Sequence, residues 1–183
     1  MGDIKRHTLA VQVANEAGVL SQVSRLFSRK GYNIESLAVG TTDSPDISRI
    51  TIEVLADDGH AALLCNQLRK LLPVHSVKLL EPTQAIRRQL VLIKVRAATS
   101  EVRNEVIQIA NIFRGFIIDV CAETITLSLI GAEEKTDAVE SLLGAFGIVE
   151  LVRTGMIALE RGQYTIDENT KEKGEFNYGK HVL

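Results

Sequence analysis

The chain has 183 residues, of which 45% are hydrophobic and 4% aromatic, with no tryptophan. This length and composition suit one compact domain or two small ones with buried cores. The formal net charge of −2 and the few aromatic rings argue against nucleic acid as a partner, because phosphate contacts need a basic excess and base stacking needs exposed rings.

The sequence also argues against membrane insertion and secretion. It contains no run of 18 or more apolar residues, and its first residues alternate instead of forming the apolar block of a signal peptide. We therefore expect a cytoplasmic protein that does not associate with membranes. The two cysteines, Cys65 and Cys121, lie far apart in sequence and are expected to be small buried hydrophobes.

The first half of the chain shows the element order β-α-β-β-α-β. Alternating apolar residues predict strands over 8–14, 34–39, 50–54 and 77–79. A helix is predicted between Gly18 and Gly31, the second glycine acting as a C-cap, and another begins at Asp57. The buried face of the first helix is predicted to consist of Val19, Leu20, Val23, Leu26 and Phe27.

The same order repeats in the second half. Strands are predicted over 90–95, 117–121, 125–129 and 148–152. Thr99 or Ser100 can cap the first helix of this half, and the sequence leaves the choice open. The second helix is predicted from the spacing of Val139, Leu142, Leu143 and Phe146.

These patterns predict an α+β protein with two tandem ferredoxin-like βαββαβ domains, over 5–81 and 85–162. Proline and polar residues at 81–84 mark the join, and a polar tail, expected to be mobile, occupies 163–183. Each unit should expose one sheet face and its edge strands, so we expect a dimer or a larger assembly.

The residues offer no active site and no metal site. No serine or cysteine stands near a base, no glycine-rich loop is built to hold phosphate, and the four histidines lack neighbouring ligands at metal spacing. The acidic pairs Asp57–Asp58 and Glu133–Glu134 fall at predicted helix starts, where they interact favourably with the helix dipole.

The stretch that best suits a ligand joins the first strand to the first helix. A helix N-terminus presents free amides that suit a carboxylate, and Gly18 lets a ligand approach the amides of Val19 and Leu20. Asn15 could hydrogen-bond both charged groups of a free amino acid. A simpler interpretation, which the local residues alone favour, is that Asn15 caps the helix and Gly18 makes the turn.

A second candidate segment follows the helix. Asn33 could supply a polar contact and Ile34 an apolar wall to a ligand at a dimer interface, whereas in the simpler interpretation Asn33 is a turn residue. The local pattern does not choose between these interpretations.

Longer runs of sequence resemble a known family. NEAGVLSQVSRLFSRKGYNIESL and TDSPDISRITI resemble the N-terminal ACT domain of acetolactate synthase (acetohydroxyacid synthase) small subunits, and IFRGFIIDV and FGIVELVRTGMIALERG resemble the C-terminal domain of that family. The resemblance covers residues 5 to 162 in order, without large gaps.

The resemblance implies a non-catalytic regulatory subunit that activates a catalytic subunit and makes it sensitive to valine. It implies a homodimer through the ACT domains, with valine between the strand–helix turn of one chain and the second strand of its partner. Asn15, Gly18, Val19 and Leu20 would form one side of this effector site, and Asn33 and Ile34 the other. Thiamine diphosphate, magnesium and FAD would belong to the catalytic subunit, and this chain would hold no cofactor.

Three other functions are compatible with this fold, and two of them fit the residues less well. An RNA-binding module needs aromatics in its central strands, which here read ISRITIEV and TITLSLIG. A metal-responsive transcription regulator needs clustered ligands and a DNA-reading segment. A stand-alone ACT-type sensor that regulates a different amino-acid enzyme shares the ligand chemistry, and only its partner separates it from the favoured function.

Overall fold

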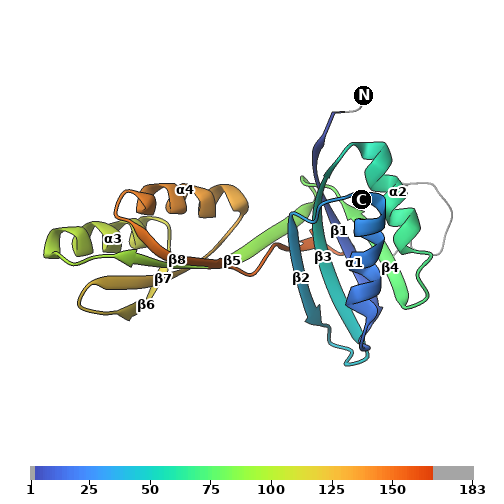
Figure 1. Cartoon of the computed structure of the whole chain (residues 1–183), viewed down its shortest axis with the longest axis horizontal. Coiled ribbons are helices and arrows are strands. Elements are labelled where there is room, and N and C mark those ends of the chain that lie inside the picture. Colours follow the sequence, from blue (N-terminus) through green and yellow to red (C-terminus); the bar gives the residue numbers. More distant parts are fainter. Residues whose placement is uncertain (1–2, 167–183) are drawn as a thin grey trace.

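The computed structural model describes residues 3–166, which form two lobes connected by one long strand (Figure 1). The first lobe consists of β1 (Lys5–Ala14), α1 (Val19–Lys30), β2 (Ser36–Thr41), β3 (Ile47–Ala56), α2 (Asp58–Leu68) and β4 (Val74–Leu80). The second consists of β5 (Ala85–Arg96), α3 (Ser100–Ile112), β6 (Phe116–Val120), β7 (Thr124–Gly131), α4 (Glu133–Gly144) and β8 (Ile148–Arg153), followed by β9 (Ile157–Glu160). The predicted α+β fold with two βαββαβ units is confirmed.

Each lobe is an antiparallel sheet with two helices on one face (Figure 1). The strand order is β2-β3-β1-β4 in the first sheet and β6-β7-β5-β8 in the second. Successive side chains of a strand point to opposite faces of the sheet, so every second residue faces the helices and contributes to the core. The largest fully buried side chains of the two cores include Leu9, Phe27, Ile50, Ile52, Leu64 and Leu68 in the first lobe, and Ile93, Ile125, Leu127, Leu129 and Leu143 in the second.

Local capping chemistry sets the helix ends. Gly31 adopts a left-handed φ of +73° after α1, and the amide of the next residue, Tyr32, donates to the Phe27 carbonyl at 3.1 Å. Asp57 caps α2 by accepting from the His60 amide, which lowers the pKa of this carboxyl. Thr99, not Ser100, caps α3 through its hydroxyl.

Some details differ from the sequence prediction. The second strand begins two residues later than predicted, at Ser36. Leu20 was predicted on the apolar face of its helix but is 42% exposed. Leu20 points in nearly the same direction around the helix axis as Phe27, yet it lies in the first turn of α1, where it is left exposed.

Strand β9 was not predicted, and it changes how the lobes meet. The first residues of β5 pair with β9, from Ala85 opposite Glu160 to Arg88 opposite Ile157, and the later residues of β5 belong to the second sheet. The paired part of β5 and β9 packs on the face of the first sheet that is turned away from its helices, in a buried cluster of Ala10, Leu80, Ala85, Ala158 and Ile166. The expectation that each unit leaves one sheet face bare is therefore wrong for the first sheet.

Ile166 belongs to the segment that was expected to form a mobile tail. It is 6% exposed, and the Lys78 ammonium donates to the carbonyl of its neighbour Thr165 at 3.0 Å. The first residues of the predicted tail thus pack on the first lobe, and the rest of the prediction falls on 167–183, outside the described residues.

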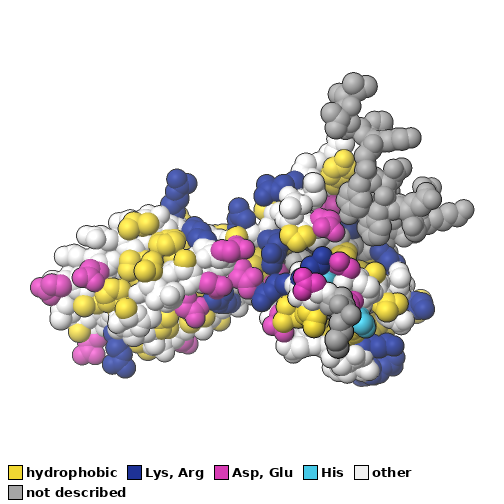
Figure 2. Space-filling view, turned by 90° about the horizontal axis from the view of Figure 1, so that it is seen from above, with side chains coloured by type: hydrophobic (Ala, Val, Ile, Leu, Met, Phe, Trp, Pro, Cys, Tyr) yellow, Lys and Arg dark blue, Asp and Glu magenta, His cyan; other side chains and the backbone are white. Residues whose placement is uncertain are grey.

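A group of charged residues also bridges the lobes. Glu53 of β3 is 1% exposed, and its carboxylate binds Arg87 of β5 as well as the Thr8 hydroxyl at 3.1 Å. Arg6 lies 3.4 Å from Glu53 and 2.5 Å from Glu133, at the start of α4. Figure 2 shows acidic and basic side chains gathered where the two lobes meet.

Candidate functional site

The turn between β1 and α1 presents open backbone amides. Gly18 is the N-cap residue of α1, with a left-handed φ of +87°, and no side chain caps this helix. A Cβ at Gly18 would meet nothing within 4 Å, so the space beside the turn is open. Among the described residues, no acceptor is within hydrogen-bonding distance of the amides of Leu20 and Ser21. These donors, at the positive end of the helix dipole, suit a carboxylate.

Val19 and Leu20 contribute to this turn in different ways. The Val19 side chain is buried in the core of the first lobe, and its amide donates to the Glu16 carbonyl at 3.4 Å, so this residue presents neither its side chain nor a free amide to a ligand. The Leu20 side chain is exposed beside the open amides and can offer an apolar surface. A helix end whose amides suit a carboxylate, next to an exposed leucine, has the chemistry to fit a small amino acid with an aliphatic side chain.

Asn15 holds the turn in place. Its Nδ2 donates to the Pro45 carbonyl at 2.8 Å, and its Oδ1 accepts from the Ser48 hydroxyl at 3.0 Å. These bonds tie the turn to the loop between β2 and β3 and to the start of β3, so the simpler interpretation that Asn15 caps α1 is wrong. Each polar group of the amide retains one further hydrogen-bonding position.

Asn33 and Ile34 lie at the opposite end of α1. The Asn33 side chain is exposed and its Nδ2 donates to the Glu35 carboxylate at 2.7 Å, while Ile34 is half-buried against the core. The 12 residues of α1 span about 18 Å. One chain therefore does not bring Gly18 and Asn33 together, and a site that uses both needs a second copy of the chain.

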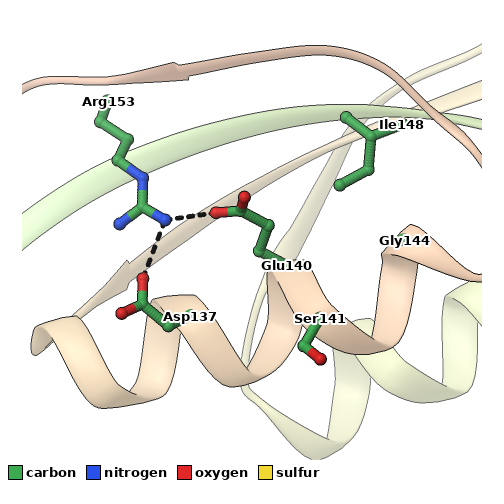
Figure 3. A pocket seen from close by; sticks show the side chains of 6 residues that line it. All are labelled: Asp137, Glu140, Ser141, Gly144, Ile148 and Arg153. Atoms are coloured by element: carbon green, nitrogen blue, oxygen red, sulfur yellow. Dashed lines mark hydrogen bonds and ion pairs between the residues drawn. The ribbon is translucent and has the colours of Figure 1, made fainter.

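A second concave region lies between α4 and β8. It is lined by Asp137, Glu140, Ser141, Gly144, Ile148 and Arg153 (Figure 3). The Arg153 guanidinium is bound by both acidic side chains, at 2.8 Å from Asp137 and by a short contact to Glu140. The positive charge of Arg153 is thus already paired with two carboxylates of the same chain.

Residues 3–166 contain neither a cluster of three potential metal ligands nor a helix long and apolar enough to cross a membrane. The two cysteines differ. Cys65 is buried as expected, whereas Cys121 is exposed because it follows the edge strand β6 at the turn into β7.

Comparison with known proteins gives the family. A family model described as "AHAS small subunit-like ACT domain" matches residues 9–76, and one described as "Small subunit of acetolactate synthase" matches residues 88–162. The acetolactate synthase small subunit of Aquifex aeolicus is 42% identical over 171 residues, covering 93% of this chain and 88% of the relative. The chain belongs to the acetolactate synthase small subunit family. All six predicted effector residues fall within its ACT domain.

Further small subunits support the assignment over nearly the same length. The acetolactate synthase small subunit of Mycolicibacterium smegmatis is 41% identical over 156 residues, covering 85% of this chain and 91% of the relative. The crystal structure of the small subunit from Thermotoga maritima is 36% identical, with a TM-score of 0.82, and the match covers 88% of this chain and all of that one. The arrangement of both lobes is therefore similar to that of a solved small subunit.

Proposed function

We propose that this protein is the regulatory subunit of acetolactate synthase in branched-chain amino-acid biosynthesis, where it activates the catalytic subunit and makes it sensitive to feedback inhibition by valine. The observation that carries the proposal is the uncapped start of α1, with its exposed amides and exposed Leu20, inside an ACT domain of this family. Thiamine diphosphate, magnesium and FAD would be held by the catalytic subunit.

A homodimer would complete the effector site. Strand β2 lies at the edge of the first sheet and begins two residues after Ile34. An edge strand offers unpaired amides and carbonyls to another chain. In the proposed dimer, Asn15, Gly18, Val19 and Leu20 of one chain face Asn33 and Ile34 of its partner, with valine between them.

Valine would act by linkage. A ligand shifts an equilibrium between two arrangements only through its different affinity for them, typically by about 1–3 kcal/mol. Valine that bridges two ACT domains would favour one arrangement of the dimer, and that arrangement would change how the chain acts on the catalytic subunit.

Calorimetric titration of the full chain with valine, leucine, isoleucine and threonine tests the proposal. We expect valine to bind saturably, with about one molecule or fewer per chain. The binding free energies of valine, leucine and isoleucine should differ by about 1–3 kcal/mol per methylene. Gly18→Asp should abolish binding, because its carboxylate repels that of the ligand. Gly18→Asn is the matched neutral control, since asparagine tolerates the left-handed conformation, and it should bind more tightly than Gly18→Asp. Wild-type-like binding by Gly18→Asp would remove this turn from the site.

A further inference from the structure

The short segment between β8 and β9 is fastened to both lobes. On the second lobe, the Thr154 amide donates to the Leu90 carbonyl at 3.1 Å, and the Leu90 amide donates to the Thr154 hydroxyl at 3.1 Å. On the first lobe, the Met156 amide donates to the Ser36 hydroxyl at 2.7 Å, and Met156 is 2% exposed. Residues 154–156 therefore connect β5 of one sheet with β2 of the other.

Gly155 makes this connection possible. It has a left-handed φ of +81°, and a Cβ at this position would lie only 2.6 Å from the Leu37 carbonyl oxygen of β2. Real Cβ atoms essentially never come so close to backbone, so only glycine fits here. The backbone of the segment thus rests directly on the start of β2.

The start of β2 immediately follows the second half of the proposed effector site. Asn33 donates to the Glu35 side chain, and the Glu35 amide donates to the Glu53 carbonyl at 2.8 Å. The next residue, Ser36, holds Met156. The side chain of Glu53 in turn binds Arg87 of β5. Two connections, one to residues 154–156 and one to the first residues of β5, therefore begin within three residues of Asn33.

We propose that residues 154–156 couple the effector site to the second lobe, so that a ligand seated against Asn33 and Ile34 changes the hold of Ser36 and Leu37 on this segment. This inference rests on the proposed function, because it needs an effector at Asn33. Packed contacts of this kind transmit small shifts because they have discrete arrangements. The second lobe then responds to the ligand without contacting it.

Hydrogen exchange of the full chain, measured by mass spectrometry with and without saturating valine, tests the coupling. We expect valine to slow exchange at 15–20 and 33–36, where it binds, and also at 154–160 and at 90–96 of the second lobe, by about 5-fold or more. Ser36→Ala removes the hydroxyl that accepts from Met156 and should abolish the effect at 154–160 while leaving protection at 15–20.

Gly155→Ala and Gly162→Ala form a matched pair. Both glycines have a left-handed φ, but a Cβ at Gly162 would meet nothing within 4 Å. Gly155→Ala should therefore abolish the distant effect of valine, whereas Gly162→Ala should retain it. If Gly155→Ala does not fold, the measurements on the wild-type chain and on Ser36→Ala are sufficient to test the coupling.

The outcomes of these measurements distinguish the proposed valine site from the proposed coupling. Protection at 15–20 and 33–36 with no change at 154–160 leaves the proposed function standing and overturns the coupling. Retention of the distant effect in Ser36→Ala also overturns it. If valine protects no segment of the wild-type chain, the proposed valine site fails and the coupling falls with it.

Discussion

The carboxylate of Glu53, buried in the sheet of the ACT domain, binds the guanidinium of Arg87, which lies on the strand that joins the two lobes. A carboxylate so far from water is stable only when it is paired. Glu53 also accepts a hydrogen bond from Thr8 and lies 3.4 Å from Arg6. The charge pairing of the ACT domain thus depends on a residue of the connecting strand.

Replacing Arg87 should therefore destabilise the protein. Arg87→Met is expected to lower the free energy of unfolding by about 3 kcal/mol, at the low end of the range for a broken buried pair because Arg6 remains nearby. Arg88→Met, at the exposed neighbouring position, is the control and should change it by less than about 0.5 kcal/mol. Urea denaturation followed by circular dichroism measures both. Equal effects of the two substitutions would contradict the role given to the Glu53–Arg87 pair.

The start of α3 offers a local test of helix capping. The Thr99 hydroxyl accepts from the Val102 amide at 3.3 Å. Thr99→Ala should cost about 1 kcal/mol of stability, because it leaves this amide without its side-chain acceptor. Ser100→Ala, one residue later, removes a hydroxyl that does not cap the helix and should be nearly neutral. Thermal denaturation measures the stability of the two variants. A larger loss of stability in Ser100→Ala than in Thr99→Ala would show that the cap is misassigned.

The two thiols should differ in reactivity. Burial raises the pKa of Cys65 from 9.0 to about 11, whereas Cys121 is exposed. The thiolate is the reactive form, so iodoacetamide at pH 8 should modify Cys121 rapidly and leave Cys65 intact until the protein is unfolded. Peptide mass spectrometry reads out both sites, and Cys121→Ser provides the control. Fast modification of Cys65 in the native protein is the result that would contradict this account.

The same shift predicts a loss of stability at alkaline pH. Since the folded-state pKa of Cys65 lies above the unfolded value, the unfolded chain releases its proton first as pH rises. The contribution of the neutral Cys65 thiol to the free energy of unfolding is fully present below about pH 9 and is lost as pH rises through about 11. Cys65→Ala should remove this part of the pH dependence in denaturation curves measured from pH 8 to 11.

Local patterns were sufficient to predict the element order from β1 to β8. Alternation and helical spacing report which way each side chain points, and this depends on the backbone of a few residues. Gly31 and Asp57 marked helix ends for the same reason, because caps act on adjacent amides and carbonyls. The exposure of Leu20 could not be read from spacing, since it depends on how far the helix extends beyond its sheet.

Relationships between the lobes could not be predicted in the same way. The Arg6–Glu133 pair is separated by 127 positions in sequence, and no local pattern indicates that the residues meet. Strand β9 does alternate, but its position on the ACT sheet follows from packing against Ala10 and Leu80. Within the candidate site, the Asn15 contacts to Pro45 and Ser48 were missed because they join a turn to residues about 30 positions later, in the β2–β3 loop and at the start of β3.

The most direct test of the proposed regulatory function is acetolactate formation by the catalytic subunit, measured alone, with this chain, and with Gly18→Asp, each with and without valine. We predict that the wild-type chain raises the activity of the catalytic subunit and that valine lowers this activity again. The Gly18→Asp variant should also raise the activity, but valine should no longer lower it. A catalytic subunit whose activity is unchanged by the wild-type chain, with or without valine, would contradict the account.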